Sequence, residues 1–196
     1  MQVPWQDISY LRAGNERQRE AFRALHSLGV FDILRDYTAV LVGTVPIGID
    51  VEESDLDIVC EAQDLDAFAR RVTSAFSRWE GFQIKRKRIK GVPSVVVGFV
   101  HAGFRVEIFG QPQPVREQHA YRHMVVEARL LAIGGEQARR EVQRLKRDGL
   151  KTEPAVAHYF NLDGDPYEVL LELSRVSEDD LRHQVHVEYV LNQREE

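Results

Sequence analysis

Hydrophobic and polar positions repeat with two different periods along this chain, and each period predicts a type of element. In residues 15–28 the side chains of Phe22, Leu25 and Leu28 fall on one helical stripe, so we expect a helix there. Residues 37–42 form an almost continuous run of β-prone residues, which is typical of a strand covered on both faces. We therefore expect this strand to lie in the centre of a sheet.

The run at residues 55–59 alternates polar and apolar side chains, which predicts a second strand. Because successive side chains of a strand point to opposite faces, Leu56 and Ile58 should face the core. Asp55 and Asp57 should then lie together on the opposite face.

The remaining pattern is one helix, three strands and then helices only. Turn residues separate the three strands, so they should form a meander, and a sheet followed by helices indicates an α+β fold with a mixed sheet. The expected elements are a helix at 64–77, strands at 82–89, 93–101 and 104–109, helices at 116–132 and 135–148, and shorter helices to the end. With a flexible boundary near 112–115, we expect an α/β core over residues 1–112 and a helical subdomain over residues 113–196, packed on the core.

Composition narrows the class of protein. The chain has 196 residues, 43% of them hydrophobic, and a net charge of −5, so it should fold and has no global attraction for nucleic acid or anionic membranes. Its single cysteine, Cys60, excludes a disulfide framework within the chain and reads as a core residue. Without an export signal or membrane segment, we expect a cytoplasmic protein.

Three carboxylates form the candidate catalytic site. Asp55 and Asp57 stand at positions i and i+2 of a strand, about 6–7 Å apart on one face, which suits a shared divalent cation. Magnesium prefers carboxylate oxygen and completes its shell with water and phosphate. Glu107 alternates with the apolar Val106 and Ile108 of a later strand, so it could complete a two-metal site.

Gly43 and Thr44 follow the first strand and supply a turn whose backbone N–H groups and hydroxyl can approach a phosphate. Together with Asp55 and Asp57, this Gly-Thr pair resembles the signature of the polymerase-β-like nucleotidyltransferases. That signature is Gly-Ser, about ten residues, Asp-x-Asp and a third carboxylate on a later strand. The chain departs from it by Thr44 in place of the usual serine, which keeps the hydroxyl, and by Glu107 where aspartate is commoner.

More of the chain is similar to a bacterial family of that superfamily known only as a domain of unknown function. That resemblance implies a nucleotidyltransferase-like fold and brings no established substrate. The segments that carry it are residues 9–11, 43–47, 54–58, 107–110, 121–124 and 149–154.

The resemblance implies transfer of a nucleoside monophosphate from an NTP to a hydroxyl acceptor, with release of pyrophosphate. In this reading Asp55, Asp57 and Glu107 bind Mg²⁺ (or Mn²⁺), and Asp57 is our choice for the proton acceptor. Gly43, Thr44 and Ser54 hold phosphates. The helical part forms the acceptor wall, where Arg122, His123 and Lys151 are the polar candidates; Arg122 and Lys151 are also candidates for the nucleotide.

Two other functions fit the same residues. The chain could bind a nucleotide without turnover, as a regulatory or antitoxin-like module, or it could be a metal-dependent phosphohydrolase in which water replaces the acceptor. The basic run at 85–90 could steer a phosphate, but basic side chains also protect exposed sheet edges, and we favour that explanation. We therefore expect a small-molecule or protein acceptor rather than nucleic acid.

One further pattern resembles a metal site. His119, His123 and Glu127 have ligand-like spacing on one helix face, yet they lack the zinc-protease motif, and surface helix histidines are common. We expect no metal there.

Overall fold

The computed structural model of this chain describes the backbone of residues 5–192 and the side chains of residues 5–185. The described chain divides into two compact units. Unit 1 comprises the residues up to Gly48 together with Glu52–Tyr121, and unit 2 comprises Ile49–Val51 together with the residues from Arg122 onward. No helix in the described range is long and apolar enough to cross a membrane.

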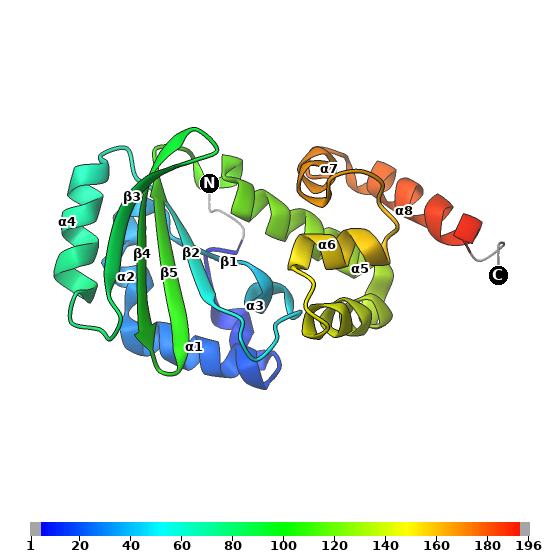
Figure 1. The fold of residues 1–196 in the computed structure, drawn as a ribbon. Coiled ribbons are helices and arrows are strands. Elements are labelled where there is room, and N and C mark those ends of the chain that lie inside the picture. Colours follow the sequence, from blue (N-terminus) through cyan, green and yellow to red (C-terminus); the bar gives the residue numbers. More distant parts are fainter. Residues whose placement is uncertain (1–4, 193–196) are drawn as a thin grey trace. The chain divides into compact units, whose positions relative to one another are not determined.

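Unit 1 is built on a five-stranded mixed sheet with the strand order β1-β2-β5-β4-β3 (Figure 1). β2 and β5 are parallel, while the other three neighbouring pairs are antiparallel. The strands are β1 Val40–Val42, β2 Leu56–Glu61, β3 Gln83–Ile89, β4 Val92–His101 and β5 Phe104–Gln111. The expected α+β class and the β3-β4-β5 meander are thereby confirmed.

The helices of unit 1 cover one face of this sheet. The buried core joins the apolar sides of α1 and α4 to the strand residues that alternate with the carboxylates, such as Leu56 and Ile108. Asp64 caps α4 by accepting backbone hydrogen bonds from Asp66 and Ala67, which fixes where that helix begins. The helices are α1 Glu16–Leu28, α2 Val30–Ile33, α3 Thr44–Ile47 and α4 Leu65–Phe76.

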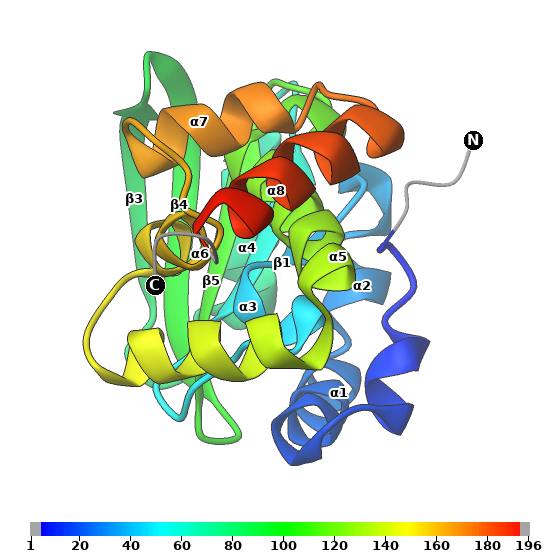
Figure 2. The same cartoon turned by 90° about the vertical axis from the view of Figure 1, so that its right-hand side faces the viewer.

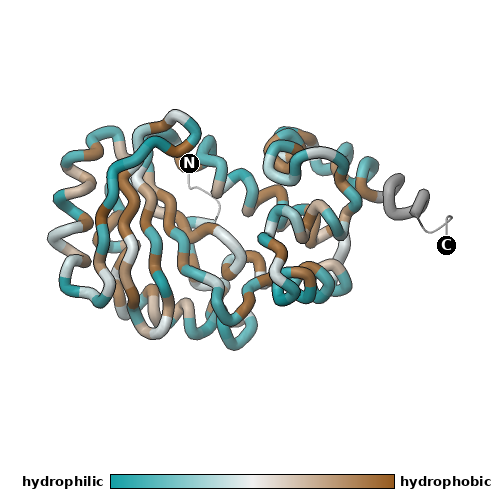
Figure 3. The backbone as a smooth tube through the Cα atoms, in the orientation of Figure 1, coloured by the Kyte–Doolittle hydropathy of each residue, from teal (hydrophilic) through white to brown (hydrophobic). Residues whose placement is uncertain are grey.

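Burial follows the predicted alternation as far as Ile58 of β2, after which Val59 is buried as well. Leu56, Ile58 and Cys60 of β2 are fully buried, whereas Asp57 between them is only partly buried. β3 is the exception, because its side chains are exposed on nearly the whole strand. It is an edge strand, and Figure 3 shows it hydrophilic along its length beside the more apolar β4.

The first strand differs from its prediction in two ways. Only Val40–Val42 pair as a strand, and residues 35–37 form a turn of 3-10 helix instead. β1 also lies at an edge of the sheet and is not central. Its three residues are all buried, and that burial explains the continuous apolar run without requiring a strand neighbour on both sides.

In its described residues unit 2 consists of helices and their connecting turns, together with the segment Ile49–Val51 (Figure 2 shows these helices in the turned view). α5 begins in unit 1 and continues through unit 2, and it bends at Gly135, whose φ of 64° and ψ of −154° are not helical. This bend separates the two helices expected at 116–132 and 135–148. The helices are α5 His119–Arg147, α6 Thr152–Tyr159, α7 Pro166–Leu173 and α8 Glu178–Asn192.

A glycine of the central strand decides how closely α4 approaches the sheet. A Cβ on Gly110 would stand 2.3 Å from the nearest ring carbon of the fully buried Phe68. We expect Gly110→Ala to lower the free energy of unfolding by roughly 1–3 kcal/mol, because the buried ring has to move. Urea denaturation measures this change. Gly98→Ala on the neighbouring strand is the matched control, since a Cβ there meets no atom within 4 Å; equal stability of the two variants would contradict the packing.

Candidate active site

The parallel pairing of β2 with β5 brings the predicted carboxylates together. In the register of these strands Asp57 is the direct partner of Glu107, and Leu56 is the partner of Val106. Asp55 precedes β2 on the same face as Asp57. The three acidic residues therefore gather on the sheet face that α1 and α4 leave uncovered within unit 1.

These carboxylates disfavour one another's charge. Burial, and after it the negative charges of Asp55 and Glu107, raise the pKa of Asp57 to about 7, although Arg105 acts in the opposite direction. The pKa of Asp55 is also raised, first by burial, with Arg105 again opposing. A site of this kind stabilises a bound cation, because positive charge relieves both the repulsion and the desolvation.

Arg105 is the cation that the structure places there. Its Nη2 donates a hydrogen bond of 2.8 Å to Oε1 of Glu107, and its Nε lies 3.9 Å from Oδ2 of Asp55. Sequence reasoning missed this residue, although it stands two positions before Glu107 on the same strand. The period of two that placed Glu107 would have placed Arg105 on the same face.

The Gly-Thr turn borders the carboxylates directly. Gly43 has a φ of 84° and a ψ of −149°, a conformation that favours glycine, and a Cβ there would stand 3.1 Å from Oδ2 of Asp57. Thr44 Oγ1 donates a hydrogen bond of 3.1 Å to Ser54 Oγ. The structure thus brings Gly43, Thr44 and Ser54 to the same corner of unit 1 as Asp57.

A divalent cation fits the chemistry of this group, whose hard oxygen donors and shared negative charge match Mg²⁺. As the side chains stand, Glu107 is engaged by Arg105. Among the described residues no three His, Cys, Asp or Glu side chains are arranged closely enough to hold a metal ion. Cation binding by these residues would therefore require their side chains to move closer together.

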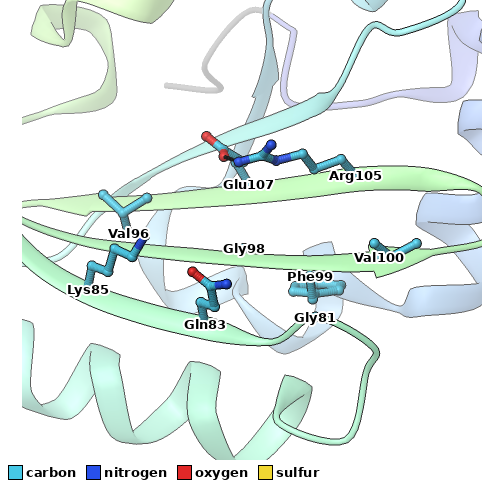
Figure 4. Close-up of a pocket in the computed structure, with 9 residues that line it drawn as sticks. All are labelled: Gly81, Gln83, Lys85, Val96, Gly98, Phe99, Val100, Arg105 and Glu107. Carbon is cyan, nitrogen blue, oxygen red and sulfur yellow. Dashed lines mark hydrogen bonds and ion pairs between the residues drawn. The ribbon is translucent and has the colours of Figure 1, made fainter.

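A hollow of about 280 Å³ opens on the same face, on the side of Glu107 away from β2 (Figure 4). Figure 4 shows Gln83 and Lys85 of β3 on the same side of the sheet as Arg105 and Glu107 of β5. Sequence reasoning did not anticipate this feature. The hollow is lined by Gly81, Gln83, Lys85, Val96, Gly98, Phe99, Val100, Arg105 and Glu107.

The remaining predicted site residues, Arg122 and Lys151, belong to unit 2. The Arg122 guanidinium donates hydrogen bonds to Ser174 Oγ and to the Leu171 carbonyl oxygen, so it holds the C-terminal end of α7. Lys151 is exposed and stands at the start of α6. Their proposed roles toward the nucleotide remain predictions.

Unit 2 also contains a buried polar cluster that includes His123 and Glu127, two of the residues that the sequence placed on one helix face. His123 bonds through Nε2 to the carbonyl oxygen of Tyr167 at 2.9 Å, and its Nδ1 lies 3.5 Å from Glu153 Oε1. Burial raises the pKa of the nearby Glu127 to about 8 and lowers that of Lys146 to about 8. These contacts join α5, α6 and α7, so His123 has a packing role here.

Solved structures with folds similar to this one include the Cid1 poly(U) polymerase and GLD-2. The Cid1 poly(U) polymerase with MgGTP bound has a TM-score of 0.53 and 15% sequence identity, over 83% of this chain and 53% of that chain. GLD-2 in its complex with RNP-8 has a TM-score of 0.54 and 13% identity, over 89% of this chain and 74% of that chain. This chain spans about half the length of Cid1. At such identities the similarity shows a shared nucleotidyltransferase fold.

A family model described as a domain of unknown function (DUF4269) matches residues 23–173. None of the curated proteins gives a significant match. The matched range begins within α1, ends at the last residue of α7, and includes the Gly-Thr turn and all three carboxylates. This chain belongs to the DUF4269 family.

Proposed function

We propose that this protein is a metal-dependent nucleotidyltransferase that moves a nucleoside monophosphate from an NTP to a hydroxyl acceptor and releases pyrophosphate. The observation that carries the proposal is the pairing of Asp57 with Glu107 across β2 and β5, beside a glycine turn that lies against Asp57. The nucleotidyltransferase fold supports it. A cluster of carboxylates without a phosphate-binding turn would not distinguish this reaction from simple cation binding.

Asp55, Asp57 and Glu107 would hold Mg²⁺, or Mn²⁺, which when bound neutralises charge on the phosphates and makes the acceptor hydroxyl more acidic. Thr44 and Ser54 would donate hydroxyl hydrogen bonds to the β- and γ-phosphates, and Gly43 would let the backbone approach them without a side chain in the way. The chain thus positions the triphosphate and offsets its charge, as phosphoryl-transfer sites generally do.

In the reaction the acceptor oxygen forms a bond to the α-phosphorus, while the bond from that phosphorus to the oxygen bridging to the β-phosphate breaks. Pyrophosphate leaves with the electron pair of the broken bond. The hydroxyl proton passes to a carboxylate of the site, for which we propose Asp57. Arg105, which donates to Glu107 Oε1, would offset part of the carboxylate charge.

The binding test compares two variants of β2. Asp57→Asn removes one charge from the site, and Glu61→Gln removes one from the same face at the other end of the strand. We expect calorimetry with the four NTPs in Mg²⁺ to show metal-dependent binding of at least one NTP to wild type. Asp57→Asn should weaken it at least tenfold, about 1.4 kcal/mol, and Glu61→Gln should leave it unchanged.

Unchanged binding in Asp57→Asn would contradict the site. The reaction products distinguish nucleotidyl transfer from hydrolysis and from nucleotide binding without turnover. Release of pyrophosphate with a hydroxyl acceptor supports transfer, and release of inorganic phosphate indicates hydrolysis. Binding of an NTP with neither product would identify a nucleotide-binding module without turnover.

The raised pKa of Asp57 predicts how stability depends on pH without metal. Its folded pKa of about 7 exceeds the ordinary value of 3.8, so its contribution to stability is present below pH 3.8 and is lost as pH rises through 7. The amide of Asp57→Asn does not ionise, so the variant does not lose this stability as pH rises. We expect the variant to match wild type near pH 4 and to exceed it increasingly up to pH 8, by as much as roughly 4 kcal/mol.

Urea denaturation of wild type and Asp57→Asn at pH 4, 6 and 8 measures this difference, with Glu61→Gln as the control that should track wild type throughout. A difference that does not grow with pH would show that Asp57 is not held in an electrostatically unfavourable position. Added Mg²⁺ should stabilise wild type at pH 8 and leave Asp57→Asn less affected, since a ligand that binds the folded state stabilises it.

A further inference from the structure

The sheet arranges the parts of the site in a fixed order across the face that carries the carboxylates. Gly43 and Thr44 follow the edge strand β1, Asp55 and Asp57 belong to the β2 segment, and Glu107 lies on β5. The hollow comes next, over β4 and β3. If the triphosphate occupies the Gly-Thr turn, as proposed above, the group on the other side of the carboxylates is the acceptor.

A glycine forms the floor of the hollow. Gly98 pairs with Glu107 on one side and with Gln83 on the other. Neighbouring strands lie about 4.8 Å apart, so the glycine separates these two side chains by roughly 10 Å. A Cβ on Gly98 would meet no atom within 4 Å, and its φ is not in the left-handed region, so neither packing nor backbone geometry in this unit requires a glycine there. Its effect is to leave space beside Glu107.

The two rims of the hollow differ in charge. Glu107, whose charge is balanced by its hydrogen bond from Arg105, lies at one rim, and Lys85 with Gln83 makes the other rim basic and hydrogen-bonding. Neither Lys85 nor Lys87 makes a hydrogen bond or ion pair with another residue in the described range. The alternate arginines of the same strand are engaged, because Arg86 pairs with Asp66 and Arg88 donates to the carbonyl oxygen of Gly91.

We propose that this hollow is the acceptor site and that it takes a small hydroxylated anion, either a phosphate ester or a carboxylate. The acceptor hydroxyl would lie at the Glu107 rim, next to the α-phosphate, and the anionic group would bind Lys85, with Gln83 donating a further hydrogen bond. A volume of about 280 Å³ is at the lower end of the roughly 300–1,000 Å³ found for small-molecule sites, which fits a small acceptor. This assignment rests on the proposed nucleotidyl transfer.

The test uses ribose 5-phosphate, gluconate and neutral ribose as probes, titrated by calorimetry into the full chain with Mg²⁺. We expect ribose 5-phosphate or gluconate to bind and ribose to bind at least tenfold more weakly, since ribose lacks the anionic group. Whichever anion binds more tightly identifies the phosphate or the carboxylate as the preferred group. Failure of both anions to bind, or equal binding of ribose, would overturn the assignment.

Three variants test whether the anion binds in the hollow. Gly98→Val fills the floor with a side chain that strands favour and that meets open space, so it should fold as well as wild type and lose at least tenfold in affinity for the anion. Lys85→Met should lose roughly fivefold to tenfold. Lys87→Met, the same change on the same face but outside the hollow, should change affinity less than twofold. Equal losses at Lys85 and Lys87 would indicate a diffuse electrostatic effect and contradict a built site.

NTP binding separates this proposal from the one on which it rests. If wild type binds no NTP, the proposed function fails. If wild type and Gly98→Val bind NTP equally while only Gly98→Val loses the anion, the acceptor site stands. Loss of NTP binding in a folded Gly98→Val would assign the hollow to the nucleotide and overturn the proposal. A urea denaturation curve for each variant confirms that it is folded.

Discussion

The parallel contact between β2 and β5 is the constraint on which the candidate site depends. Each strand alone carries partly buried acidic residues between buried apolar ones, a pattern that an ordinary surface strand can also have. Pairing them in register places Asp57 beside Glu107 and forces two negative charges onto one partly buried face. Such an arrangement lowers the stability of the isolated fold. A bound cation would relieve it, which is the physical reason to interpret these residues as a binding site.

Arg105 offsets part of the charge of these carboxylates. Its guanidinium bonds to Glu107 and approaches Asp55, yet 65% of its side chain is exposed, so water screens much of its effect. An exposed ion-pair partner such as Arg105 is displaced from a carboxylate more easily than a buried one. The contact therefore limits the repulsion in the cation-free protein without closing the site to a stronger cation.

The parts of the site follow a fixed order across the sheet face that carries the carboxylates. The glycine turn, the aspartates, Glu107 and the hollow follow one another from β1 to β3, and charge changes from acidic to basic along that line. The two edge strands of the sheet differ in length and in exposure. β1 is short and buried, whereas β3 is long, exposed and basic. Lys85 of this edge strand places positive charge at the end of the hollow.

The sequence by itself determined the α1 and α4 helices, the three-stranded meander and the i, i+2 aspartates, because these are local patterns with a period of two or of about 3.6 residues. It also selected Glu107 by the same alternation. It could not determine that β1 is an edge strand, that β5 lies parallel to β2, or that Arg105 lies against Glu107. Strand order depends on pairing between segments about fifty residues apart, and no local period records it. The hollow likewise required the tertiary structure. The missing side chain at Gly98 leaves a space only because strand pairing puts Gln83 and Glu107 on either side of it.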